Sequence, residues 1–186
     1  MKKIALLIFL SALLCVSCAD LVQLDIDNPT RKEKQITIDD QVILLKPESI
    51  TTVEVERGYH NLYMANDSVT DYKFYENHYL INPTGTEYIL EKFNYSKFSN
   101  SNRDLSDALF NKQHSLEVVF LGYTIKGNYE VYNNIVIPKD WHFGPRVELP
   151  DEITVENMQF SHSRTVRKMF APDEFIRYQM ELKNQK

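Results

Sequence analysis

Cysteine, glycine and long apolar runs are all scarce in this chain. The only two cysteines among 186 residues are Cys15 and Cys18, which excludes a framework of several disulfides. The five glycines form no phosphate-binding loop, dinucleotide-binding fingerprint or nucleophile elbow. The main apolar run, residues 4–14, is shorter than the roughly 20 residues that a membrane-spanning helix needs. The sequence therefore lacks the usual signatures of nucleotide-binding enzymes, serine hydrolases and disulfide-rich scaffolds.

Basic residues are outnumbered as well. Lysine and arginine total 21 against 26 acidic residues, and the formal net charge is −5. Loss of residues 1–17 would remove Lys2 and Lys3 but no acid, and would bring the charge to −7. Such a chain is not attracted to a phosphate backbone or to anionic lipid. We expect no nucleic-acid partner, and any membrane attachment must come from something other than charge.

The first 18 residues have the layout of a secretion signal. Residues 1–3 carry two lysines, residues 4–14 are apolar apart from one serine, and residues 15–18 read Cys-Val-Ser-Cys. This segment resembles the signal of bacterial membrane lipoproteins, in which a small residue precedes the acylated cysteine. Ser17 fits that pattern, whereas Cys15 stands where leucine is usual.

The resemblance implies how the mature chain is held. Residues 1–17 would be removed, and acyl chains such as palmitate on Cys18 would anchor the domain to a lipid membrane. Ala19 after the cysteine implies the outer membrane of a bacterial cell. A redox or metal pair in Cys-x-x-Cys is rejected, because cleavage discards Cys15. The alternative is an ordinary signal cleaved near Ser17, with Cys18 left free.

The region that follows has the pattern of short β-strands. Residues 22–27 alternate, with Val22, Leu24 and Ile26 on one face and polar residues on the other. Turn signals then separate further short runs up to residue 90. Residues 172–174, Pro-Asp-Glu, are typical of a helix start. We predict a mainly β fold, with a small antiparallel β-sandwich, a second β-rich segment and a short C-terminal helix.

Parts of the first region resemble PEGA-like and immunoglobulin-like β-sandwich modules of bacterial envelope proteins. The residues that carry this resemblance are 26–30 (Ile-Asp-Asn-Pro-Thr), 36–40 (Ile-Thr-Ile-Asp-Asp), 53–55 (Val-Glu-Val) and 57–60 (Arg-Gly-Tyr-His). The resemblance implies an adhesion, spacer or binding module without chemistry of its own.

Composition divides the chain into four parts. They are a signal peptide over residues 1–17, a β-sandwich module over residues 18–98, a linker with a short helix over residues 99–114, and a β-rich segment ending in a helix over residues 115–186. The linker is inferred from its serine and asparagine content.

Two aromatic groups are the candidate binding surface. Tyr59 and Tyr63 lie in a tyrosine-rich stretch, and Trp141 and His142 lie in a turn-flanked loop. Trp141 is the best single candidate for a ring that is exposed because it binds a partner. Such rings can stack on sugars or anchor a protein partner, whereas the alternative is that they fill the core.

Metal and catalytic groups give weaker patterns. The five histidines show no metal-binding spacing, so no metal or other cofactor is predicted. Asp25 and Asp27 beside Asn28 offer oxygen ligands for Ca²⁺, but an outward polar strand face is the preferred interpretation. No catalytic residues are predicted, because the carboxylates are too scattered to assign an acid–base pair.

Three functions remain open from the sequence. The preferred one is a non-enzymatic envelope lipoprotein, anchored through Cys18, that binds or spaces an envelope protein or glycan. A second is an envelope enzyme acting on glycans, with carboxylates from the C-terminal half beside Trp141. A third is an accessory subunit of an envelope transport or assembly complex, which would carry an exposed apolar patch.

Overall fold

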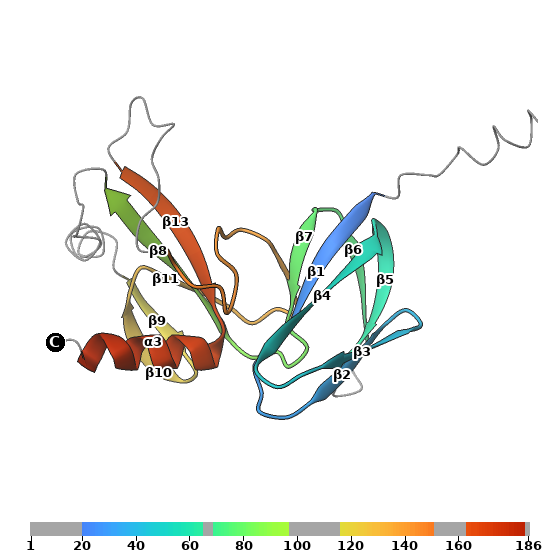
Figure 1. Ribbon diagram of the computed structural model, residues 1–186, viewed down its shortest axis with the longest axis horizontal. Helices are drawn as coiled ribbons and strands as arrows, with labels where there is room; N and C mark the ends of the chain where they lie inside the picture. Colours follow the sequence, from blue (N-terminus) through green and yellow to red (C-terminus); the bar gives the residue numbers. More distant parts are fainter. Residues whose placement is uncertain (1–19, 65–68, 97–115, 151–162, 185–186) are drawn as a thin grey trace, which may run out of the picture.

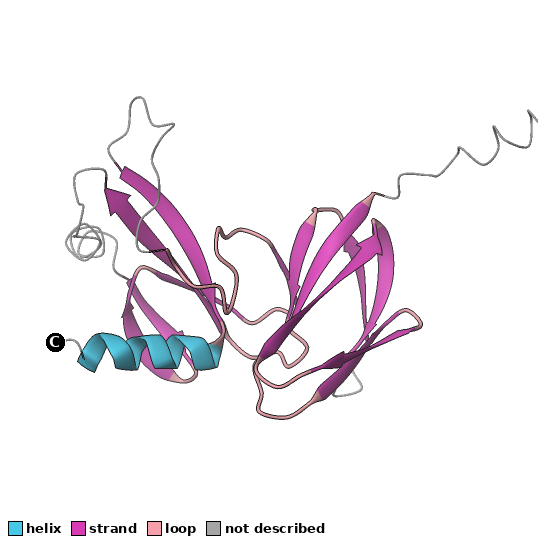
Figure 2. Ribbon diagram, viewed as in Figure 1, coloured by secondary structure: helices cyan, strands magenta, loops and turns pink. Residues whose placement is uncertain are grey.

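The computed structural model is mainly β (Figures 1 and 2). The residues that it describes are 20–64, 69–96, 116–150 and 163–184. Thirteen strands and one helix make up the regular structure of these ranges, which confirms the predicted fold class. The predicted signal over residues 1–17, the predicted anchor Cys18 and the predicted linker over residues 99–114 lie outside the described residues.

A two-layer β-sandwich, here called the first sandwich, is built from two four-stranded sheets. Their strand orders are β12-β7-β1-β4 and β3-β2-β5-β6. The strands are β1 (Leu21–Asn28), β2 (Lys34–Ile38), β3 (Gln41–Leu45), β4 (Ser49–Glu56), β5 (Gly58–Tyr63), β6 (Val69–Phe74), β7 (His78–Ile81) and β12 (Val136–Pro138). All neighbours are antiparallel except β1 and β7, which run parallel. The predicted antiparallel sandwich therefore contains one parallel pair.

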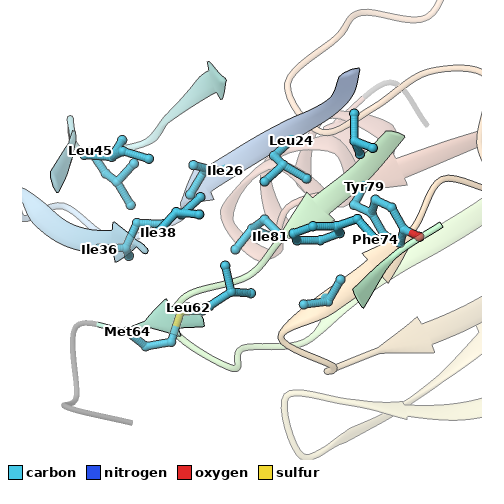
Figure 3. Close-up of a cluster of buried hydrophobic side chains, with 13 residues drawn as sticks. Leu24, Ile26, Ile36, Ile38, Leu45, Leu62, Met64, Phe74, Tyr79 and Ile81 are labelled. Atoms are coloured by element: carbon cyan, nitrogen blue, oxygen red, sulfur yellow. The ribbon is translucent and has the colours of Figure 1, made fainter. Parts of the chain in front are cut away.

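The alternation in β1 explains where the core of the sandwich lies. Val22, Leu24 and Ile26 are fully buried and face apolar side chains of the opposite sheet. Figure 3 shows this cluster, in which the rings of Phe74 and Tyr79 have centroids 4.9 Å apart. Burial of one such aliphatic side chain stabilises a fold by about 1.5–3 kcal/mol. This core therefore holds the two sheets together.

The remaining elements form a second unit. They are β8 (Tyr88–Ser96), β9 (Leu116–Phe120), β10 (Tyr123–Gly127), β11 (Tyr129–Tyr132), β13 (Ser163–Phe170) and α3 (Pro172–Asn184). Strands β11-β8-β13 form one sheet and β9-β10 a hairpin, while Phe175 of α3 packs on Phe120 and Phe170. At the start of α3 the Glu174 carboxylate accepts a hydrogen bond from the Ala171 N–H at 3.2 Å, which caps the helix. The helix predicted from residue 172 is confirmed.

The chain does not divide between its sheets at residue 98. Strand β8, which the sequence assigned to the first module, hydrogen-bonds to β11 and β13 of the second unit. Strand β12, from the later part of the chain, returns to pair with β7 of the first sandwich. A further apolar cluster, which includes Leu80, Ile137 and Met169, packs where these strands meet. The two units are therefore joined by a crossing strand and a shared core.

Candidate functional site

Two predicted surface residues, Tyr59 and Tyr63, lie on the outer face of the β3-β2-β5-β6 sheet. In β5 the side chain of Leu62 enters the core, while Tyr59 and Tyr63 point to solvent with exposed fractions of 74% and 43%. Strand alternation causes this arrangement, since neighbouring side chains leave opposite faces of a sheet. The two rings are therefore available to a partner, and their use in binding stays a prediction.

Lys73 lies between two exposed tyrosine rings of this surface. The Lys73 ammonium lies 4.9 Å from the ring centroid of Tyr59 and 5.0 Å from that of Tyr75, which is also exposed. An ammonium at such a distance is attracted to the electron-rich face of an aromatic ring. We call Tyr59, Tyr63, Lys73 and Tyr75 the tyrosine face.

The prediction that Trp141 is exposed is wrong. Its side chain is only 6% exposed and packs in the cluster between the two units, with Tyr88, Leu90 and Met169. Burial of a large apolar ring stabilises the fold. A turn-flanked position in the sequence does not reveal that such a contact is available. Trp141 therefore fills the junction between the units, on the opposite side of the first sandwich from the tyrosine face.

His142 is exposed but does not join the tyrosines. Its Nδ1 accepts a hydrogen bond from the Arg167 N–H at 3.1 Å, so the imidazole is tied to β13. Partial burial, together with the nearby charges of Arg164 and Arg167, lowers the pKa of His142. The predicted group of Tyr59, Tyr63, Trp141 and His142 is therefore split between two separate places.

The junction of the units holds a buried ionic network that the sequence did not predict. The Arg146 Nε donates to Asp27 Oδ1 at 2.8 Å, and its two Nη atoms donate to the carboxylate of Asp173 at 3.0 Å each. The Tyr88 hydroxyl donates to Asp27 Oδ2 at 2.7 Å. We call these four residues the Arg146 network. It ties β1 of the first sandwich to the N-terminus of α3.

Burial sets the protonation behaviour of this network. Asp27 is fully buried, and burial raises the pKa of its carboxyl even though Arg146 and Tyr88 stabilise the charged form. Burial and the neighbouring Asp27 raise the pKa of Tyr88 well above its usual value. Asp27 therefore does not lie on a solvent-facing strand face, because the second unit covers that end of the sheet.

Lys168 adds a second ion pair beside the Arg146 network. Its Nζ donates to Glu174 Oε1 at 2.7 Å and to the backbone carbonyls of Gly144 and Met169 at 2.7 and 2.8 Å. Burial lowers the pKa of Lys168, while Glu174 partly opposes the shift. Asp173 and Glu174, two carboxylates of the C-terminal half, are thus both engaged by cations. They act here as structural anchors of the helix.

A smaller polar cluster surrounds Asp25, which lies two residues before Asp27 on the same face of β1. The Asp25 carboxylate accepts hydrogen bonds from Thr52 at 2.7 Å and Gln23 at 3.1 Å, and lies 2.6 Å from His78 Nε2. The other ring nitrogen of His78 lies 3.1 Å from the Lys139 ammonium. Because an ammonium only donates, we assign His78 the tautomer that donates from Nε2 to Asp25.

Asp25 and Asp27 therefore have different partners rather than a shared cation. In the ranges that the structure describes, no group of three histidine, cysteine or acidic side chains is placed to hold a metal ion. Burial disfavours the charged form of Asp25, but the hydrogen bonds from Thr52, Gln23 and His78 outweigh it and lower its pKa.

Asp25→Asn is expected to lower the free energy of unfolding by about 1–2 kcal/mol at pH 7, because charge-assisted hydrogen bonds are lost. A carboxyl with a lowered pKa stabilises the fold above its unfolded pKa of about 3.9, and that stabilisation is lost as the pH falls through the folded value. Urea unfolding at pH 7 and near pH 3 should therefore show the variant effect shrinking in acid. The exposed Asp71→Asn is the control, and an effect that grew in acid would contradict this assignment.

No helix among the described residues is long and apolar enough to cross a membrane. Comparisons with protein-family models, with curated proteins and with solved structures give no match for this chain.

Proposed function

We propose that this chain is a non-enzymatic lipoprotein of the bacterial cell envelope that binds a partner protein through the tyrosine face. The exposed rings of Tyr59, Tyr63 and Tyr75 on one sheet carry the binding part of the proposal. Tyrosines are enriched at protein interfaces because they combine large apolar area with a polar end. The signal over residues 1–17 and Cys18 supports the anchoring part.

The surroundings of the tyrosines favour a protein over a glycan. Val69 lies directly opposite Tyr63 in the β5–β6 ladder, and Thr37 lies opposite both Tyr63 and Val42. Val42 is 57% exposed and Val69 is 54% exposed, so one row across the sheet presents apolar side chains. Branched aliphatic groups pack against apolar protein side chains, whereas sugar recognition depends on flat rings and hydrogen bonds.

Site-specific photo-cross-linking tests this proposal in cells that make the full chain. A benzophenone amino acid in place of Tyr59 or Tyr63 is expected to give a discrete protein adduct after irradiation. The matched control is the same replacement of Tyr123, which is 76% exposed but lies in the hairpin of the second unit.

Equal adducts at Tyr59 and Tyr123 would contradict a specific surface, as would no adduct at Tyr59 and Tyr63. An adduct removed by a muramidase but resistant to protease would assign the tyrosine face to glycan instead.

A further inference from the structure

Strand β3 is unusual among the edge strands of the described sheets, because it carries neither a charge nor a proline. The other edge strands are β4, β6, β9, β10, β11, β12 and β13. Each of these holds at least one charged residue except β12, which holds Pro138. Charges and proline at an edge hinder pairing with another chain. Strand β3 reads Gln-Val-Ile-Leu-Leu and lacks this protection.

The side chains of β3 are also apolar on both faces. Ile43 and Leu45 enter the core of the first sandwich, whereas Val42 and Leu44 are 57% and 60% exposed. Apolar side chains on both faces are typical of a strand whose sheet is covered on both sides. In the described part of the chain, β3 has only β2 as a hydrogen-bonded neighbour. The Leu45 carbonyl accepts a hydrogen bond from Asn28 Nδ2 at 3.1 Å. No second strand of the described residues pairs with the open edge of β3, however, and the side chains of Val42 and Leu44 are exposed beside it.

The residues around β3 are self-complementary in charge. Asp40 precedes the strand and Lys46 follows it, and both are exposed without an ion pair to another described residue. If two copies of the strand run antiparallel about a two-fold axis at Ile43, Val42 of each copy lies opposite Leu44 of the other. The same register places Asp40 opposite Lys46 at both ends. Opposite charges at paired positions stabilise a sheet, and like charges destabilise it.

We propose that β3 pairs antiparallel with β3 of a second copy of this chain, centred on Ile43. The pairing joins the two β3-β2-β5-β6 sheets into one continuous sheet and satisfies the outward backbone groups of both edges. Val42 and Leu44 then contact each other across the axis. The axis is perpendicular to the sheet, so the outer faces of both copies, with Tyr59 and Tyr63, lie on the same side. The dimer depends on neither the anchor nor the function of the tyrosine face.

Cysteine cross-linking of the full-length chain in isolated membranes tests the pairing. In this register the two copies of residue 42 are diagonal neighbours about 7–8 Å apart, within reach of a short bis-maleimide. Val42→Cys is expected to give a dimer band. Val69→Cys is the matched control, because Val69 is nearly as exposed (54%) and lies on β6 at the opposite edge of the same sheet. The unsubstituted chain reports any cross-link through Cys15 or Cys18.

A charge exchange then tests the register. In the Val42→Cys chain, Asp40→Lys or Lys46→Asp is expected to weaken dimerisation about tenfold, because two like-charge contacts form in each dimer. The two substitutions together should restore the band. Dimer bands from Val42→Cys and not from Val69→Cys, with recovery in the charge-exchanged chain, support the proposal. The absence of a dimer, equal bands from both cysteines, no recovery, or a cross-link to a different protein would each overturn it.

Discussion

Replacement of Arg146 by methionine is expected to lower the free energy of unfolding by about 3–5 kcal/mol at pH 7, because it leaves a buried charge without its partner. Arg146 engages Asp27 of β1 and Asp173 of α3, which are far apart in the sequence. Methionine keeps most of the apolar bulk, so the loss reports the missing guanidinium rather than a cavity. Since whole domains are stable by about 5–15 kcal/mol, the variant should approach the limit of folding at 37 °C.

Urea unfolding, followed by circular dichroism, measures this loss. The control is Arg57→Met, because Arg57 also donates two hydrogen bonds to one carboxylate, that of Asp20, but in an exposed position. Exposed ion pairs stabilise little, so the control should unfold almost as the unsubstituted chain does. If both variants lost the same stability, the Arg146 network would not be what ties the two units together.

The pH dependence of the stability loss tests whether Asp27 is the buried charge that Arg146→Met leaves without its partner. Burial already raises the pKa of Asp27, and loss of Arg146 should raise it further. A folded chain that binds a proton more tightly than the unfolded chain gains stability as the pH falls towards the unfolded pKa of about 3.9. The deficit of Arg146→Met should therefore shrink between pH 7 and pH 5. Adding Asp27→Asn should recover part of the loss at pH 7, since the buried charge is then gone.

The local structure of this chain could be predicted from residue patterns. Alternation placed Val22, Leu24 and Ile26 in a core, and Pro172 marked the start of the helix. Both patterns depend on neighbours in the sequence, which fix the face of a strand or the first turn of a helix. The pairing of β8 with β13 and of β12 with β7 could not be predicted, because nothing local specifies which distant strand completes a sheet.

The same limit applies to the buried polar sites. Asp27 does lie on the strand face opposite Val22 and Leu24, as alternation predicts, but its partner Arg146 is 119 residues away. A sequence does not say what covers a polar face. Arg146 itself adopts a left-handed backbone conformation with φ +62°, which is uncommon for arginine. Trp141 was misplaced for a related reason, since a loop position says nothing about the cluster that the ring enters.

Cys18→Ser is expected to abolish incorporation of radiolabelled palmitate and to move the protein out of the detergent phase in a phase-separation assay. Charge would not hold the mature chain at the membrane, because its net charge is negative and does not attract it to anionic lipid. Only Ala19 and Asp20 separate Cys18 from Leu21, the first residue of β1. At about 3.3–3.6 Å per residue, the proposed anchor would hold the first sandwich within about 10 Å of the lipid.

Cys15→Ser is the matched control, because it alters the neighbouring cysteine of the same signal and should leave labelling intact. Arg57 pairs with Asp20 and donates to Asn77 as well, so the chain is tied to the sandwich at the second residue after the proposed anchor. If labelling followed Cys15 instead, the acylated residue would have been misassigned. If Cys18→Ser were still labelled and did not change its partition, Cys18 would not be the required anchor. Loss of label in Cys18→Ser alone would establish the anchor on that sulfur.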